Sequence, residues 1–132
     1  MQFLFSLNQI IAIHDTLIQE FGGSYGIRDQ GLLESAIQQP FQSFSGEDLY
    51  PTIFDKAAAI AFFISENQPF IDGNKRTAAS AAGVFLDVNG HELNCPSGQL
   101  YDVMMQLANK QISREELSKW FQKYAIKRKS RR

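Results

Sequence analysis

The chain has 132 residues, 44% hydrophobic and 20% charged, which is typical of a single globular domain. The longest apolar run, 57–64, is too short to span a bilayer, and the N-terminus lacks the basic flank and length of a signal peptide. We therefore expect a cytoplasmic protein without a membrane segment. The single cysteine, Cys95, excludes an internal disulfide, and two separate histidines give no zinc cluster.

The charge is distributed unevenly along the chain. Five of the thirteen basic residues lie in 127–132, which leaves eight basic against fourteen acidic residues and a charge of about −6 in residues 1–126. This acidic body argues against a nucleic-acid-binding protein, although the tail alone could touch RNA or an acidic partner. We predict one domain over 1–126 and a basic tail over 127–132 that is disordered.

A first helix is predicted from its cap and its periodicity. Ser6, with Gln9 at the capping-box position, precedes apolar residues that repeat at helical spacing as far as Phe21. The glycines at 22–23 end this helix. His14 lies within the apolar stripe, which predicts a buried, hydrogen-bonded histidine rather than a metal ligand or a catalytic base.

The next segment contains a glycine-rich loop and a second helix. The loop, 22–26, is not a phosphate-binding P-loop because no apolar strand precedes it and no Gly-Lys-Ser/Thr follows it. Asp29 caps a helix that runs through about residue 39, where Pro40 ends it. Residues 41–51 are irregular and rich in aromatic side chains.

Two apolar helices follow, with a polar loop between them. Thr52 and Asp55 cap the helix over 53–66, and the helix over 74–89 ends at an Asn-Gly signal. Both helices are rich in alanine and other small residues. Small residues allow the two helices to approach closely, so we expect this central pair to hold the loop rigidly.

The last third of the chain adds a short extended piece and two helices. Residues 91–95 are extended, Ser97 caps a fifth helix, and a capping box at Ser113 begins the last one. The sequence contains no repeats, low-complexity linkers or domain boundaries. It predicts an all-α, single-domain helical bundle of about six helices, with at most a small β-hairpin.

The polar loop between the central helices carries the candidate chemistry. A helix that begins at Gly73 presents free N–H groups and the positive end of its dipole, which favour an anion such as phosphate. Asn74 can cap the turn or donate to an oxygen, and Lys75 and Arg76 add two positive charges. Asp72, an acid within a phosphate site, is suited to hold Mg²⁺ that shares the phosphate oxygens.

Residues 69–76 read Pro-Phe-Ile-Asp-Gly-Asn-Lys-Arg, which resembles the signature of the Fic/Doc (Fido) family. The stretch is most similar to the death-on-curing branch, which reads His-Pro-Phe-x-Asp-Gly-Asn-Lys-Arg-Thr. The Fic branch proper has Gly in place of Lys75 and a second Arg at the position of Ala79. Residues 21–37 also resemble the early part of death-on-curing proteins, and the resemblance extends from about residue 7 to residue 121.

One departure from the family pattern falls on the chemistry. The family motif opens with a histidine that acts as the general base, whereas this chain has Gln68 there. A histidine titrates near neutral pH and can accept a proton from an attacking hydroxyl, whereas an amide cannot. General-base catalysis contributes about 10²–10⁴-fold, so we expect an inactive or impaired enzyme, through natural divergence or deliberate inactivation.

The resemblance implies the toxin of a toxin–antitoxin module: an ATP- and Mg²⁺-dependent transferase that modifies a Ser/Thr hydroxyl of a translation-machinery protein. Lys75 and Ala79 depart from the nucleotidyl-transfer pattern, so a kinase is favoured over a nucleotidyl (AMP) transferase. The predicted catalytic residues are Gln68, Asp72, Lys75 and Arg76, with Asp72 as metal ligand. The predicted contacts to ATP or another nucleotide are Gly73, Asn74, Lys75, Arg76 and Ser80.

Two further alternatives stay open at this point. Because Gln68 cannot titrate, the chain could be a catalytically silent protein that binds a nucleotide or a partner. In the family, a flap near 41–51 holds the target polypeptide, partly by strand addition, whereas the other interpretation places Phe41, Phe44 and Tyr50 in the core. Since no complete inhibitory motif of the family is present, we expect a separate antitoxin protein as partner.

Overall fold

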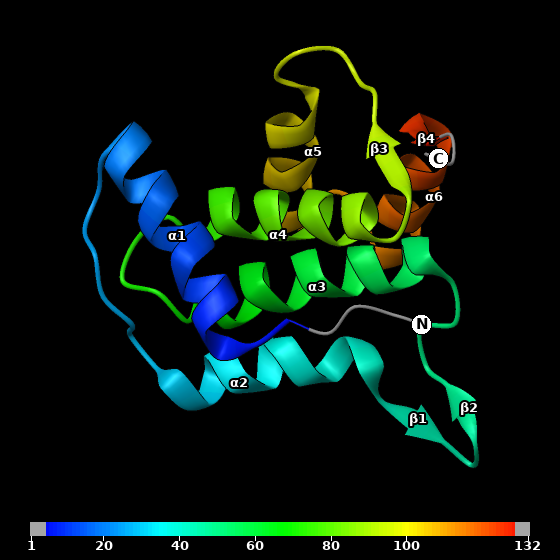
Figure 1. Ribbon diagram of the computed structural model, residues 1–132, viewed down its shortest axis with the longest axis horizontal. Coiled ribbons are helices and arrows are strands. Elements are labelled where there is room, and N and C mark those ends of the chain that lie inside the picture. The colour runs from blue at the N-terminus through cyan, green and yellow to red at the C-terminus, as the bar shows by residue number, and fades with distance from the viewer. Residues whose placement is uncertain (1–4, 129–132) are drawn as a thin grey trace, which may run out of the picture.

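The computed structural model describes residues 5–128, which form a mainly helical domain, as predicted (Figure 1). The helices are α1 Leu7–Phe21, α2 Gln30–Gln38, the short 3₁₀ helix Gln39–Phe41, α3 Ile53–Asn67, α4 Asn74–Val88, α5 Gln99–Ala108 and α6 Arg114–Tyr124. The strands are β1 Ser43–Phe44, β2 Glu47–Asp48, β3 His91–Leu93 and β4 Ala125–Lys127. None of the helices in the described range is both long and apolar enough to cross a membrane.

The centre of the fold is the antiparallel pair of α3 and α4. The two helices lie side by side, α2 runs along α3, and α1 crosses α4 near its first turn (Figure 1). Helices α5 and α6 pack on the remaining sides of α4 and α3. The contact between the central helices depends on small, fully buried residues, among them Ala57, Ala58, Ala61, Ala78, Ala81 and Ala82. This close contact fixes the loop that joins α3 to α4.

Most of the predicted helix starts are confirmed. Reciprocal capping boxes are formed by Ser6 with Gln9, Thr52 with Asp55 and Ser113 with Glu116. The carboxylate of Asp29 accepts the N–H of Leu32 at the start of α2. The predicted Ser97 cap is wrong, because the N-cap of α5 is the next residue, Gly98, whose left-handed backbone (φ 86°) makes the turn without a side-chain cap.

Strands β1 and β2 form a small antiparallel hairpin that projects from the helical body (Figure 1). Phe44, at this hairpin, is 75% exposed, whereas Phe41 is half-buried and packs edge-on against Phe85. Tyr50, just after the hairpin, packs edge-on against Phe63. The aromatic segment therefore divides: its flanks pack on the core, and its hairpin stands free with one exposed ring.

A second two-stranded sheet was not predicted. Strand β3 pairs antiparallel with β4, so the end of α6 is tied to the end of α4. Arg128 continues this link, because its N–H donates to the Gly90 carbonyl and its guanidinium lies 3.1 Å from an Asp87 carboxylate oxygen. The first two residues of the predicted tail are thus part of the fold, and 129–132 lie outside the described residues.

Candidate active site

The connection between α3 and α4 is turned by two residues with left-handed backbone. Gln68 ends α3 at φ 46° and ψ 58°, and Gly73 starts α4 at φ 77°. A Cβ added to Gly73 would lie 3.1 Å from Ile18 Cδ1, so close packing against α1 also favours a glycine there. The chain therefore reverses direction within a few residues and presents Gln68 and the first turn of α4 on the same side.

Arg28 fixes the end of α3 from the segment before α2. Its Nε–H donates to the Gln68 carbonyl and its Nη2–H to the Asn67 carbonyl, both at 2.7 Å. The backbone N–H groups of Arg28 and Asp29 both donate to the Pro69 carbonyl. Because α3 has no basic residue in its own last turn, Arg28 supplies the positive charge that a helix C-terminus favours.

His14 supports the loop from α1. The side chain is 1% exposed, its ring stacks on the ring of Phe70 at 3.9 Å, and its Nε2 lies 2.7 Å from the Asp72 carbonyl oxygen. The prediction of a buried, hydrogen-bonded histidine is confirmed, and Phe70, which is 1% exposed, anchors the loop in the core. Sequence reasoning missed that the partner of His14 is the backbone of the site loop.

The glycine-rich loop after α1 packs directly against the Asp72 carboxylate. One carboxylate oxygen accepts the N–H of Gly73 at 2.9 Å, and the other accepts the N–H of Ser24 at 3.2 Å. A Cβ on Gly23 would lie 2.7 Å from that second oxygen, so only glycine fits there. A carboxylate has about four lone-pair directions, and two of them remain for a cation. From the sequence only a P-loop was excluded here, and the glycines of this loop are the signal that could have pointed to its contact with Asp72.

Asn74 does not cap α4, which corrects one of its predicted roles. Its Oδ1 accepts the Phe70 N–H and its Nδ2 donates to the Phe70 carbonyl, both at 2.9 Å, so its side chain closes the loop. No side chain caps α4. The N–H groups of the first turn of α4 therefore remain available to a bound anion.

A cavity of about 560 Å³ opens beside this loop and brings most of the predicted site residues together. The predicted residues that line it are Gln68, Asp72, Gly73, Asn74, Lys75 and Arg76. Ser80 is half-buried further along α4 and does not line it. Six lining residues were missed, among them Glu66 on α3, Tyr101 on α5 and Asn109 just after α5.

Lys75 and Arg76 give the cavity two positive charges. Lys75 and Arg76 are both exposed, and within residues 5–128 neither forms an ion pair. The cavity therefore combines two uncompensated cations, the N-terminus of α4 and a carboxylate with free lone pairs. This arrangement suits a polyphosphate that is bound together with a divalent cation.

Comparison with known proteins agrees with this geometry. The model of the Fic/DOC family matches residues 4–86, which include the whole site loop. Toxin Doc of Mycolicibacterium smegmatis is 47% identical over 73 residues, 55% of this chain and only 56% of that toxin. Protein kinase doc of Escherichia phage P1 is 32% identical over 108 residues, 82% of this chain and 84% of the kinase. On both the family match and the coverage of the phage kinase, the chain belongs to the Fic/DOC family.

Proposed function

We propose that the chain is a Doc-type toxin whose binding site is suited to ATP-dependent phosphoryl transfer to a protein. The observation that carries this proposal is the pair of cations Lys75 and Arg76, which form no ion pair within residues 5–128, beside Asp72 at the uncapped start of α4. The names of the two relatives, Toxin Doc and Protein kinase doc, support the toxin and kinase assignments. The substrate would be a Ser/Thr hydroxyl of a translation-machinery protein, and a separate antitoxin would restrain the toxin in the cytoplasm.

The residues of the cavity fit ATP together with Mg²⁺. The N–H groups of the first turn of α4 and the side chains of Lys75 and Arg76 would bind the phosphates. Asp72 would hold Mg²⁺ through its free lone pairs, while its bonds to Gly73 and Ser24 fix the carboxylate in place. The cation would neutralise charge on the phosphates during transfer.

The chemical step explains why Gln68 matters. The substrate oxygen forms a bond to the γ-phosphorus, the bond from that phosphorus to ADP breaks, and the hydroxyl proton must leave. Gln68 lines the cavity but its amide cannot accept this proton, so we propose that the chain is inactive or strongly impaired. A kinase is favoured over an AMP transferase because Lys75 and Ala79 stand where nucleotidyl transferases keep Gly and Arg.

Calorimetry of MgATP binding tests the site on the chain with Gln68 in place. Asp72→Ala, Lys75→Ala and Arg76→Ala should each cost about 1.5–3 kcal/mol of binding free energy, because each removes a charge-assisted contact. Lys123→Ala on α6 is a control cation outside the cavity and should leave binding unchanged. Unchanged affinity in all three site variants would place the nucleotide elsewhere.

Restoring a base tests the reaction. Gln68→His should turn a tolerated protein into a growth inhibitor and should transfer label to a protein target from γ-labelled ATP. Its activity should rise with pH through the imidazole pKa, because only the neutral ring accepts a proton. Label from α-labelled ATP alone would instead identify an AMP transferase.

The second candidate function is a catalytically silent nucleotide- or partner-binding protein, which Gln68 alone favours. It predicts that the chain and its Gln68→His variant both bind MgATP and both fail to transfer phosphate. Equal activity of the two would show that no base at position 68 is needed. A Gln68→Ala variant serves as the matched control in each assay.

A further inference from the structure

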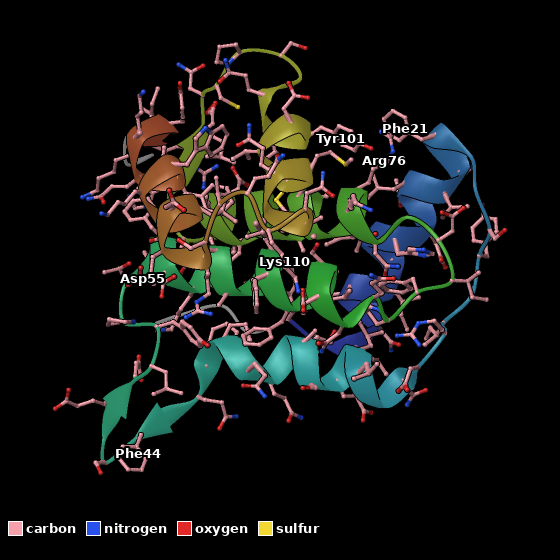
Figure 2. All side chains as sticks on the ribbon, turned by 180° about the vertical axis from the view of Figure 1, so that it is seen from behind. Phe21, Phe44, Asp55, Arg76, Tyr101 and Lys110 are labelled. Carbon is pink, nitrogen blue, oxygen red and sulfur yellow. The ribbon has the colours of Figure 1, made fainter. Side chains whose placement is uncertain are left out.

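Arg76 is held between two aromatic rings that come from different helices. Its guanidinium carbon lies 4.3 Å from the ring centre of Phe21 and 5.2 Å from that of Tyr101. Phe21 is the last residue of α1, Tyr101 lies in the first turn of α5, and Arg76 lies in the first turn of α4. Figure 2 shows Arg76 between these two rings at one edge of the molecule. The contact therefore joins three helix ends at the mouth of the cavity.

Neither Phe21 nor Tyr101 is a core residue of the domain. Phe21 is 58% exposed and Tyr101 is 41% exposed, whereas Phe70, Phe85 and Phe121 are almost completely buried. Burial of these two rings thus contributes less to the stability of the fold than burial of the core rings does. Their best-defined contact is the one that they make with the guanidinium of Arg76.

Aromatic rings hold a guanidinium in a way that a carboxylate cannot. The face of a ring attracts the cation electrostatically, yet it occupies none of the five N–H donors of the guanidinium. A carboxylate partner would take two of those donors and neutralise the charge. Within residues 5–128, Arg76 has no such carboxylate partner, so its charge and its in-plane donors remain available to a ligand.

We propose that Phe21 and Tyr101 form an aromatic clamp that positions Arg76 to bind a phosphate group in the cavity. The two rings are positioning residues, and Arg76 makes the contact with the anion. This inference deepens the proposed function and rests on it, because it assigns the way in which one phosphate-binding side chain is oriented. Tyr101 and Arg76 both line the cavity, so the clamp lies at its wall.

The energetic role of the clamp is preorganisation. A free arginine side chain loses rotamer freedom when it binds a phosphate, which weakens the binding. Rings on two helices restrict the guanidinium before the ligand arrives, so this loss occurs during folding instead. The clamp also fixes the ends of α1 and α5 relative to the first turn of α4, where the anion would bind.

The clamp is tested by MgATP calorimetry on the full chain. The double variant Phe21→Leu/Tyr101→Leu should bind MgATP about two- to tenfold more weakly, because the arginine must then be ordered on binding. Each single variant should show part of this loss. Phe21→Tyr and Tyr101→Phe keep a ring and should retain the full affinity. Tyr124→Leu removes a similar contact with Lys123 outside the cavity and should have no effect.

A double-mutant cycle with Arg76→Ala separates positioning from direct contact. If the rings act through Arg76, Phe21→Leu/Tyr101→Leu should cause no further loss in the Arg76→Ala background. An equal loss in that background would mean that the rings touch the nucleotide themselves, which would overturn the clamp. Full affinity of the ring variants, with a weakened Arg76→Ala, would also overturn it while leaving the proposed function standing. Unchanged affinity in Arg76→Ala alone would overturn the clamp, whereas unchanged affinity in Asp72→Ala and Lys75→Ala as well would contradict the proposed function itself.

Discussion

The two ends of the α3–α4 pair differ in whether their basic side chains are paired with carboxylates. At the end where α3 starts and α4 stops, Lys56 lies 3.0 Å from a carboxylate oxygen of Asp48, and Arg128 is paired with Asp87. At the other end, Lys75 and Arg76 have no carboxylate partner within residues 5–128. The same two helices thus use cations for stability at one end and leave them available to a ligand at the other.

The comparison predicts its largest effect at Lys56. The side chain is 1% exposed and its ammonium group donates to Asp48 and to the Tyr50 carbonyl. Lys56→Ala should lower the free energy of unfolding by about 2–4 kcal/mol, because it removes both bonds and leaves a cavity. Urea denaturation measures this loss, and the affinity for MgATP should not change.

Lys75→Ala makes the same substitution at the other end of the helix pair and should have the reverse effect of Lys56→Ala. It should change the free energy of unfolding by less than about 0.5 kcal/mol, since its side chain is exposed and unpaired, while MgATP binding weakens. The contrast between the two ends would fail if both lysine variants lost stability equally or if both lost affinity equally.

Arg28 is the next test, because it stabilises the site end without lining the cavity. Arg28→Ala should cost about 1–1.5 kcal/mol of unfolding free energy, since two carbonyls at the end of α3 lose a charged donor. In the Gln68→His background it should lower turnover more than it lowers MgATP affinity, because it releases the backbone at position 68. A lysine lacks the forked guanidinium that donates to both carbonyls, so the stability and turnover of Arg28→Lys should lie between those of Arg28→Ala and of the chain with Arg28.

Asp55, in the first turn of α3, makes the stability of the fold depend on pH. Burial raises the pKa of its carboxyl, but hydrogen bonds from Ser118, at 2.6 Å, and from Thr52 outweigh burial and hold the pKa below its ordinary value of 3.8. Because the pKa of this carboxyl is lower in the fold than in the unfolded chain, its charge stabilises the fold at pH values above the unfolded-state pKa. This stabilisation is lost as the pH falls through the folded-state pKa.

Ser118→Ala measures that contribution. It should cost about 1 kcal/mol at about pH 7 and less at an acid pH below the ordinary value of 3.8, where the Asp55 carboxyl gains protons. Urea midpoints at the two pH values give the difference. A loss that is the same at both would show that the Asp55 charge plays no part.

Gln68 is the position where a substitution is expected to stabilise the fold. A non-glycine residue with left-handed backbone is strained, so Gln68→Gly should raise the free energy of unfolding by about 0.5–1 kcal/mol. Asn67→Gly, one residue earlier and still in α3, is the control and should be destabilising. Thermal unfolding compares the two, and a destabilised Gln68→Gly would mean that the glutamine side chain holds the loop.

The sequence predicted the features that depend on near neighbours. The cap at Ser6 was predicted correctly because its partner, Gln9, is three residues away and the pairing needs no tertiary contact. The same holds for the caps at Thr52 and Ser113. The resemblance to the family located the site loop, and the structure brings its predicted residues to one cavity, apart from Ser80.

The support of the loop could not be predicted, because its partners are distant in sequence. His14 bonds to Asp72 across 58 positions and Arg28 to Gln68 across 40, and no local pattern selects those pairs. Asn74 was assigned to a cap because its residue type favours caps. Its side chain instead bonds back to the Phe70 backbone, a choice that depends on the turn before it.

The left-handed backbone of Gln68 also limits which substitutions at this position can serve as inactive controls for proton transfer. β-Branched residues such as valine are strongly disfavoured at positive φ, so Gln68→Val would distort the loop as well as remove the amide. Loss of function in such a variant would report on backbone geometry and not on proton transfer. Asparagine and glycine tolerate this conformation, so Gln68→Asn and Gln68→Gly alter the side chain while preserving the turn and can be assayed beside Gln68→Ala.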